Sequence, residues 1–128
     1  MLTAITFALV VSSSTESDPV VSLAQQAEVQ VGSVGIDGHL GRTSISVRRI
    51  RALRDPLDVF LAMATSPSAV TRVAAAAGLR DYPSDARAQA ALTGLRGDDD
   101  HVTVRRGCLV MALAVSQAVA DVVRWGEV

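Results

Sequence analysis

The chain has 128 residues, the length of one domain, and we treat residues 1–128 as a single unit. Apolar residues make up 49% of the sequence and the net charge is −1, a composition that excludes a disordered chain. All 12 basic residues are arginines, but they are balanced by acidic residues, and we therefore do not expect nucleic acid as the main partner. Aromatic residues are only 3%, so the core must be built from Ala, Val and Leu, whose small size allows close helix packing.

An apolar run at residues 5–11 raises the question of targeting. The run is shorter than the roughly 18–20 apolar residues that a membrane span needs. No basic residue precedes Arg42, and alanine is missing from the candidate cleavage position, so the run lacks the features of a secretory signal. We predict a cytoplasmic protein without a membrane span, with a first helix over residues 2–11.

Further along, apolar residues recur at helical spacing, which predicts a series of helices. The next helix begins after Asp18, an N-cap residue type followed by Pro19 in the first turn. Pro56, Pro67 and Pro83 mark later boundaries, since proline interrupts a helix interior. The predicted helices cover residues 20–27, 46–54, 57–65, 70–80, 88–95 and 101–115, and a final segment begins at residue 116.

Residues 31–44 interrupt this helical pattern. The segment contains four glycines, which oppose a helix, and Asp37-Gly38 lies between short apolar alternations. We predict a glycine-rich loop or a small hairpin here and leave both alternatives open.

The helix predicted over residues 101–115 differs from the others because apolar residues surround it almost completely. Val104, Cys108 and Met111 share one face, while Leu109 and Leu113 lie elsewhere. A helix of this kind is buried between neighbours. We therefore expect Cys108 in the core, and we expect the aspartates at 98–100 to stabilise the N-terminus of this helix.

A helix-start pattern recurs at residues 20–24, 47–50, 70–74 and 104–108, and the last two copies lie 34 residues apart. The junctions at 66–70 and 99–105 each combine a proline or acidic turn with a following valine. In these features the chain resembles the HEAT-like repeats of the family first named from phycobilisome lyases. The resemblance implies an all-α fold, a HEAT-like α-solenoid of about three antiparallel helix pairs, with residues 31–44 inserted between repeats.

Catalytic and metal-binding patterns are weak in this sequence. Cys108, His39 and His101 are too few and too widely spaced for a zinc site, and no phosphate-binding loop is present. Neither histidine has a nucleophile motif beside it. We predict no enzymatic activity, no metal and no cofactor.

One cluster of charge lies in the helix predicted over residues 46–54. Its members, the candidate partner-binding residues, are Arg48, Arg49, Arg51 and Arg54. One interpretation is a solvated helix face, paired partly with Asp55 and Asp58. The other is contact with an acidic protein partner or a phosphate backbone.

HEAT-like repeats usually serve as scaffolds for protein contacts, and the resemblance therefore implies a non-enzymatic protein–protein interaction or scaffold module. Two alternatives stay open. One is a nucleic-acid-binding helical repeat that uses the arginine-rich face, and the other is an accessory subunit or a fragment of a longer helical solenoid.

Overall fold

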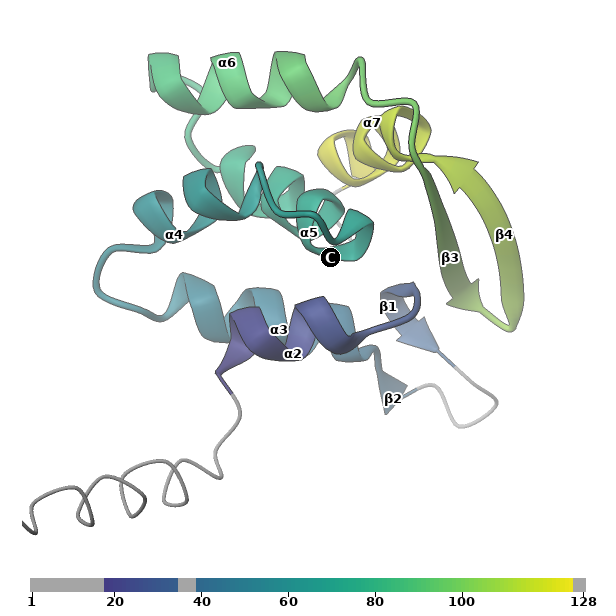
Figure 1. The fold of residues 1–128 in the computed structure, drawn as a ribbon. Coiled ribbons are helices and arrows are strands. Elements are labelled where there is room, and N and C mark those ends of the chain that lie inside the picture. Colours follow the sequence, from purple (N-terminus) through teal and green to yellow (C-terminus); the bar gives the residue numbers. More distant parts are fainter. Residues whose placement is uncertain (1–17, 35–38, 126–128) are drawn as a thin grey trace, which may run out of the picture.

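The computed structural model describes residues 18–34 and 39–125, where six helices combine with a four-stranded sheet (Figure 1). The helices are α2 (Pro19–Gln25), α3 (Arg42–Arg51), α4 (Pro56–Met63), α5 (Ala69–Leu79), α6 (Ala86–Leu95) and α7 (Val115–Trp125). The strands are β1 (Val29–Val34), β2 (His39–Leu40), β3 (His101–Gly107) and β4 (Leu109–Ala114). The helix predicted over residues 2–11 lies outside the described residues.

The sheet is mixed, with the strand order β2-β1-β3-β4. The inner strands β1 and β3 are parallel, and Val29 is paired with Val104. Each inner strand has an antiparallel neighbour, β2 beside β1 and β4 beside β3. The sheet lies at one side of the helical part of the molecule, and β4 forms its outer edge (Figure 1).

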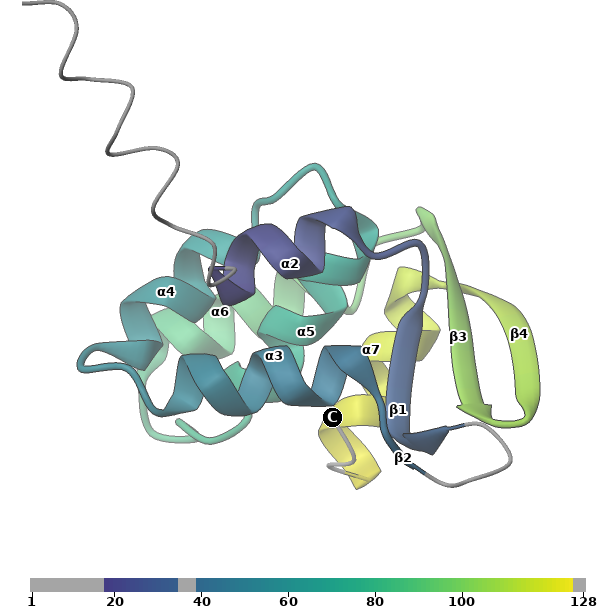
Figure 2. The ribbon, with the colours of Figure 1, turned by 90° about the horizontal axis from the view of Figure 1, so that it is seen from below.

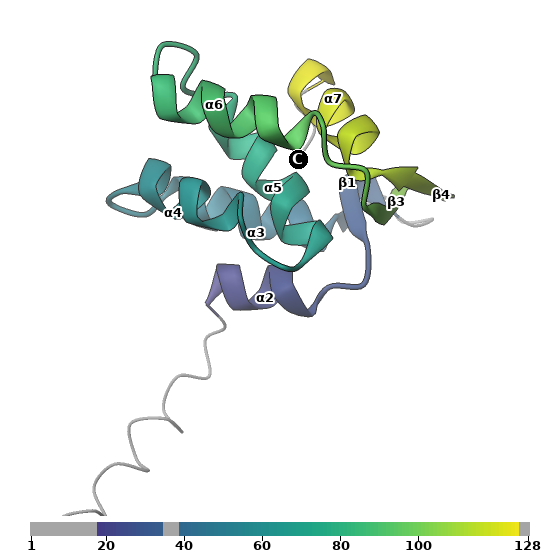
Figure 3. The ribbon, with the colours of Figure 1, turned by 45° about the horizontal axis from the view of Figure 1, so that its top comes forward.

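Helix α5 is the centre of the helical part. It contacts all five other described helices as well as β1 and β3, and it lies between α6 and α2 (Figure 3). Every residue from 70 to 79 except Arg72 is buried. The short side chains of residues 74–77, all alanine, allow this close approach from several directions.

The mixed sheet contradicts the predicted all-α solenoid. Residues 101–115, predicted as one buried helix, form the antiparallel hairpin β3–β4 and the first residue of α7. The last helix pair of the expected repeat array, formed by residues 101–115 and the segment after them, is therefore absent from the described residues. Cys108, expected in the core, lies exposed in the hairpin turn.

The physical reason for this error lies in the two periodicities that the segment carries. Val102 and Val104 are buried while His101 is exposed and Thr103 is half-buried, an alternation typical of a strand. The apolar residues of β4 also fit helical spacing, because a continuous apolar run does not distinguish a helix from a strand. Pairing with β1, which lies far away in the sequence, stabilises the strand.

Within residues 31–44, β1 and β2 form an antiparallel hairpin, one of the two predicted alternatives, but it belongs to the sheet and is not an insertion between repeats. Helix α3 starts at Arg42, four residues before the predicted start at residue 46. Gln30 fixes this start: its Oε1 accepts a hydrogen bond from the Arg42 N–H at 2.8 Å, and its own N–H donates to Thr43 Oγ1 at 2.9 Å. Gly41 permits the contact, since a Cβ there would lie 2.8 Å from the Gln30 Cβ.

The remaining predicted helices are present as α2, α4, α5, α6 and α7, with shifted ends. Ser68 caps α5 by accepting a hydrogen bond from the Thr71 N–H at 3.2 Å, and Asp85 caps α6 through the N–H groups of Arg87 and Ala88. No helix in the described ranges is long and apolar enough to cross a membrane.

Candidate functional site

The four arginines of the predicted cluster do not form one site. Arg51 is tied to the fold, because its Nε lies 2.9 Å from Asp81 Oδ2 and its Nη2 donates to the Ala77 carbonyl at 2.9 Å. The other three, Arg48, Arg49 and Arg54, are exposed. Two of them lie in the last turn of α3, where positive charge interacts favourably with the helix dipole.

The aspartates at 98–100 do not lie at a helix N-terminus, as the sequence had suggested, but before strand β3. Two of them bind one arginine of α5: Arg72 contacts Asp98 at 2.8 Å and Asp100 at 2.7 Å. Arg72 also donates to the Ser66 carbonyl at 2.9 Å. The hydrogen bond from Arg72 lowers the pKa of Asp100, so this cluster is a structural clamp between α5 and the start of β3.

The residues considered for metal or nucleophilic chemistry are also far from one another. His101 is exposed at the start of β3 and Cys108 is exposed in the hairpin turn, while His39 belongs to β2 at the opposite edge of the sheet. Among the described residues, no group of three His, Cys, Asp or Glu side chains is arranged to hold a metal ion.

The feature that stands out on the surface is strand β4. The hairpin turn consists of Gly107 and Cys108, since Arg106 is paired with Leu109. Gly107 has a φ of 60° and no other described residue except Gly32 has a positive φ, a pattern that matches a type II′ turn. This turn closes a tight hairpin, whose outer strand lies at the rim of the molecule (Figure 2).

The register of the hairpin determines which backbone groups of β4 remain available. In a two-residue hairpin the pair next to the turn exchanges hydrogen bonds, and the pairs then alternate. The N–H and C=O groups of Val110 and Ala112 therefore point away from β3. The same alternation directs the Ala114 N–H outward, and it donates to Gln117 Oε1 at 3.1 Å. The open part of the edge thus ends at residue 113.

Strand β4 also lacks the features that usually protect an edge. Its sequence, LVMALA, contains no charge and no proline, both of which natural edge strands use against unwanted pairing. Leu109 is 59% exposed and Val110 is 47% exposed. In contrast, the opposite edge is only the two-residue strand β2.

The inner partner of this edge is held firmly in place. Arg105 of β3 contacts Glu28, just before β1, at 2.6 Å. The hydrogen bond from Arg105 lowers the pKa of Glu28, so both groups are charged at neutral pH. The β3–β4 hairpin is therefore joined to the start of β1 by a side-chain contact in addition to the backbone ladder.

Compared with known proteins, the chain matches no family model and no curated relative. The β4 edge was missed by the sequence reasoning, which assigned these residues to a helix. The signal that indicates it is the alternation along β3 followed by Gly107, a residue suited to a hairpin turn.

Proposed function

We propose that the protein is a non-enzymatic protein-interaction module that pairs through the edge of β4. The observation that carries this proposal is a six-residue, uncharged edge strand with outward backbone groups at Val110 and Ala112. Strand addition uses such backbone groups for affinity and the neighbouring side chains for specificity. The predicted role, a protein interaction, is thus proposed again, but through the edge of a strand and not through a helical solenoid.

The occupant we propose is a second copy of this chain. Two β4 strands can pair antiparallel about a two-fold axis only if residues with outward backbone groups face each other. The register centred on Met111 meets this condition, because it places Val110 opposite Ala112 of the other copy. It also uses the whole open edge from residue 109 to residue 113.

The side chains support this register. Leu109 would face Leu113 of the second copy, and Met111 would face its own equivalent, which places apolar groups together on one side of the joined sheet. No charge on either strand would oppose another. Pairing would also cover the exposed Leu109 and Val110 and join the two sheets into one.

A disulfide cross-link tests the register directly. Residues opposite each other in a non-hydrogen-bonded antiparallel pair have Cα atoms about 4.5 Å apart, within the range of a disulfide. In a Cys108→Ser background, Met111→Cys should therefore give a covalent dimer on mild oxidation. The control is Thr103→Cys in the same background, since β3 is an inner strand and should stay monomeric.

Solution mass measures the interaction without a cross-link. Sedimentation of the unmodified chain should show a monomer–dimer equilibrium, and Val110→Lys should shift it to monomer because lysine on an edge disfavours pairing. Val110→Thr, which keeps the preference for a strand, should retain the dimer. A monomer at all concentrations, together with no cross-link at residue 111, would contradict the proposed occupant.

A second candidate function is nucleic-acid binding through Arg48, Arg49 and Arg54. It is favoured by the exposure of Arg48 and Arg49 on α3 and of Arg54 in the segment that follows this helix. None of the three forms an ion pair with another described residue. We place it second because the chain has no net positive charge. The cytoplasmic location stays a prediction. The alternative of a fragment of a longer solenoid is contradicted, because the fold is not a solenoid.

A further inference from the structure

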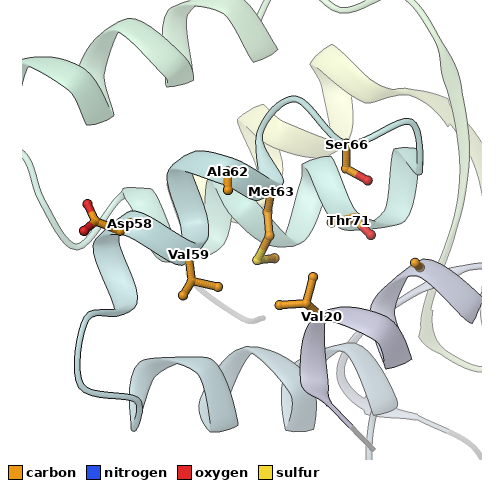
Figure 4. A pocket seen from close by; sticks show the side chains of 8 residues that line it. Val20, Asp58, Val59, Ala62, Met63, Ser66 and Thr71 are labelled. Carbon is orange, nitrogen blue, oxygen red and sulfur yellow. The ribbon is translucent and has the colours of Figure 1, made fainter. Parts of the chain in front are cut away.

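A cavity of about 420 Å³ lies between α2, α4 and the start of α5, away from the β4 edge (Figure 4). Its volume falls within the range of small-molecule sites, roughly 300–1,000 Å³. Most of its wall is apolar, and the side chains come from two helices: Val20, Ala24, Val59, Ala62 and Met63. Met63 is flexible and can adapt to the shape of a bound molecule.

The polar residues of the wall differ in what they offer. Ser66 Oγ already accepts a hydrogen bond from the Ser68 N–H at 3.1 Å. Asp58 is exposed and its carboxylate lies 3.7 Å from Arg87. Thr71, at the end of the cavity near Ser66, is only 1% exposed, and its Oγ1 has no hydrogen-bond partner among the described residues (Figure 4).

An unpaired buried hydroxyl is unusual, since most buried polar groups have a partner. Threonine in a helix populates two χ1 rotamers, so exchange between them can bring the Thr71 hydroxyl to the contents of the cavity. None of the described residues that line the wall is basic, and Asp58 would repel an anion. The wall therefore favours a neutral molecule with one polar group.

We propose that this cavity binds a small, neutral, mostly apolar molecule whose single hydroxyl or carbonyl group forms a hydrogen bond with Thr71. The apolar part of the molecule lies against Val20, Val59 and Met63. The bound molecule satisfies the hydroxyl that the described residues leave unpaired. This inference is independent of the β4 edge, because the cavity and the edge share no residue.

The test uses n-octanol as the probe and backbone amide NMR shifts of the full chain as the readout. We expect saturable shifts confined to α2, α4 and the start of α5. Ala62→Phe should abolish them, because Ala62 is exposed on the cavity wall and a ring there occupies the cavity without entering the core. The matched control is Ala90→Phe, at an exposed position of α6, which should bind n-octanol normally.

Thr71→Val separates a ligand-binding role from a purely structural one. It removes the hydroxyl and keeps the shape, so it should weaken n-octanol binding about five- to tenfold, the equivalent of one neutral hydrogen bond. It should also raise the Tm of the unliganded protein by about 2–5 °C, because an unpaired buried hydroxyl is removed. No saturable shifts up to the solubility limit of n-octanol, or equal affinity in Thr71→Val or Ala62→Phe, would overturn the proposal.

Discussion

Two glycines in equivalent helix positions provide a sharp test of the packing around α5. Gly78 and Gly94 are each the penultimate residue of a helix, α5 and α6 respectively. A Cβ on Gly78 would collide with the ring of Phe60, whereas a Cβ on Gly94 would meet nothing within 4 Å. Substitution by alanine therefore adds the same methyl group to two very different surroundings.

The effect of each substitution on stability depends on the balance between the gain in helix propensity and the cost of any collision. Replacing a helical glycine by alanine stabilises a helix by about 0.5–1 kcal/mol, and Gly94→Ala should raise the free energy of unfolding by this amount. At Gly78 the same gain is opposed by the collision. Phe60 is 0% exposed and belongs to the hydrophobic core, where overpacking costs about 1–3 kcal/mol. We therefore expect Gly78→Ala to lower the free energy of unfolding by about 1–2 kcal/mol.

Urea unfolding followed by circular dichroism measures both variants, and the difference between them isolates the collision. Gly78→Ala should lower the free energy of unfolding less in a Phe60→Leu background than in the unmodified chain, because the smaller side chain makes room for the methyl group. Equal stabilisation by Gly78→Ala and Gly94→Ala would refute the close contact between α4 and α5.

Two further predictions concern charge. Arg72 lowers the folded pKa of Asp100, so this pair adds stability above the ordinary aspartate pKa of about 4, and this stability is lost as the pH falls through the lower folded pKa. In thermal unfolding from pH 7 to pH 3, Asp100→Asn should therefore show a smaller loss of Tm than the unmodified chain. An equal loss of Tm would contradict the clamp. For the exposed arginines, we expect no binding to duplex or single-stranded DNA in about 0.15 M salt by fluorescence anisotropy; micromolar binding that is lost when Arg48, Arg49 and Arg54 are changed to Gln would favour the second candidate function.

The sequence was sufficient for the helices whose signals are local. For α5 and α6, apolar residues at helical spacing predicted both helices, and the structure adds side-chain caps from Ser68 and Asp85. The sheet was not predictable in this way, because β1 and β3 are separated by four helices and no local pattern links Val29 to Val104. Once the hairpin was taken for a helix, the 34-residue spacing reinforced the error.

For the candidate sites, too, the sequence was informative about properties that depend on neighbouring residues and uninformative about contacts between distant segments. The exposure of Arg48 and Arg49 agrees with a polar helix face, which is a local property, whereas Arg54 is exposed beyond the end of α3 at Arg51. The role of Arg51 depends on Asp81, which comes close only through the packing of α3 against α5. The β4 edge depends on sheet order, so it could be recognised only after the pairing of all four strands was known.

The parallel pair β1–β3 also has a consequence for how the chain acquires its structure. During synthesis, β1 leaves the ribosome before α3, α4, α5 and α6, and its inner neighbour follows only after them. Closing so long a loop is entropically unfavourable, which slows folds that rely on distant pairing. Until β3 arrives, one side of β1 has no strand beside it, and a nascent chain in this state is exposed to association with its neighbours. The synthesis of β3 thus gives β1 its parallel neighbour and also ends the period in which that side of β1 is open to association.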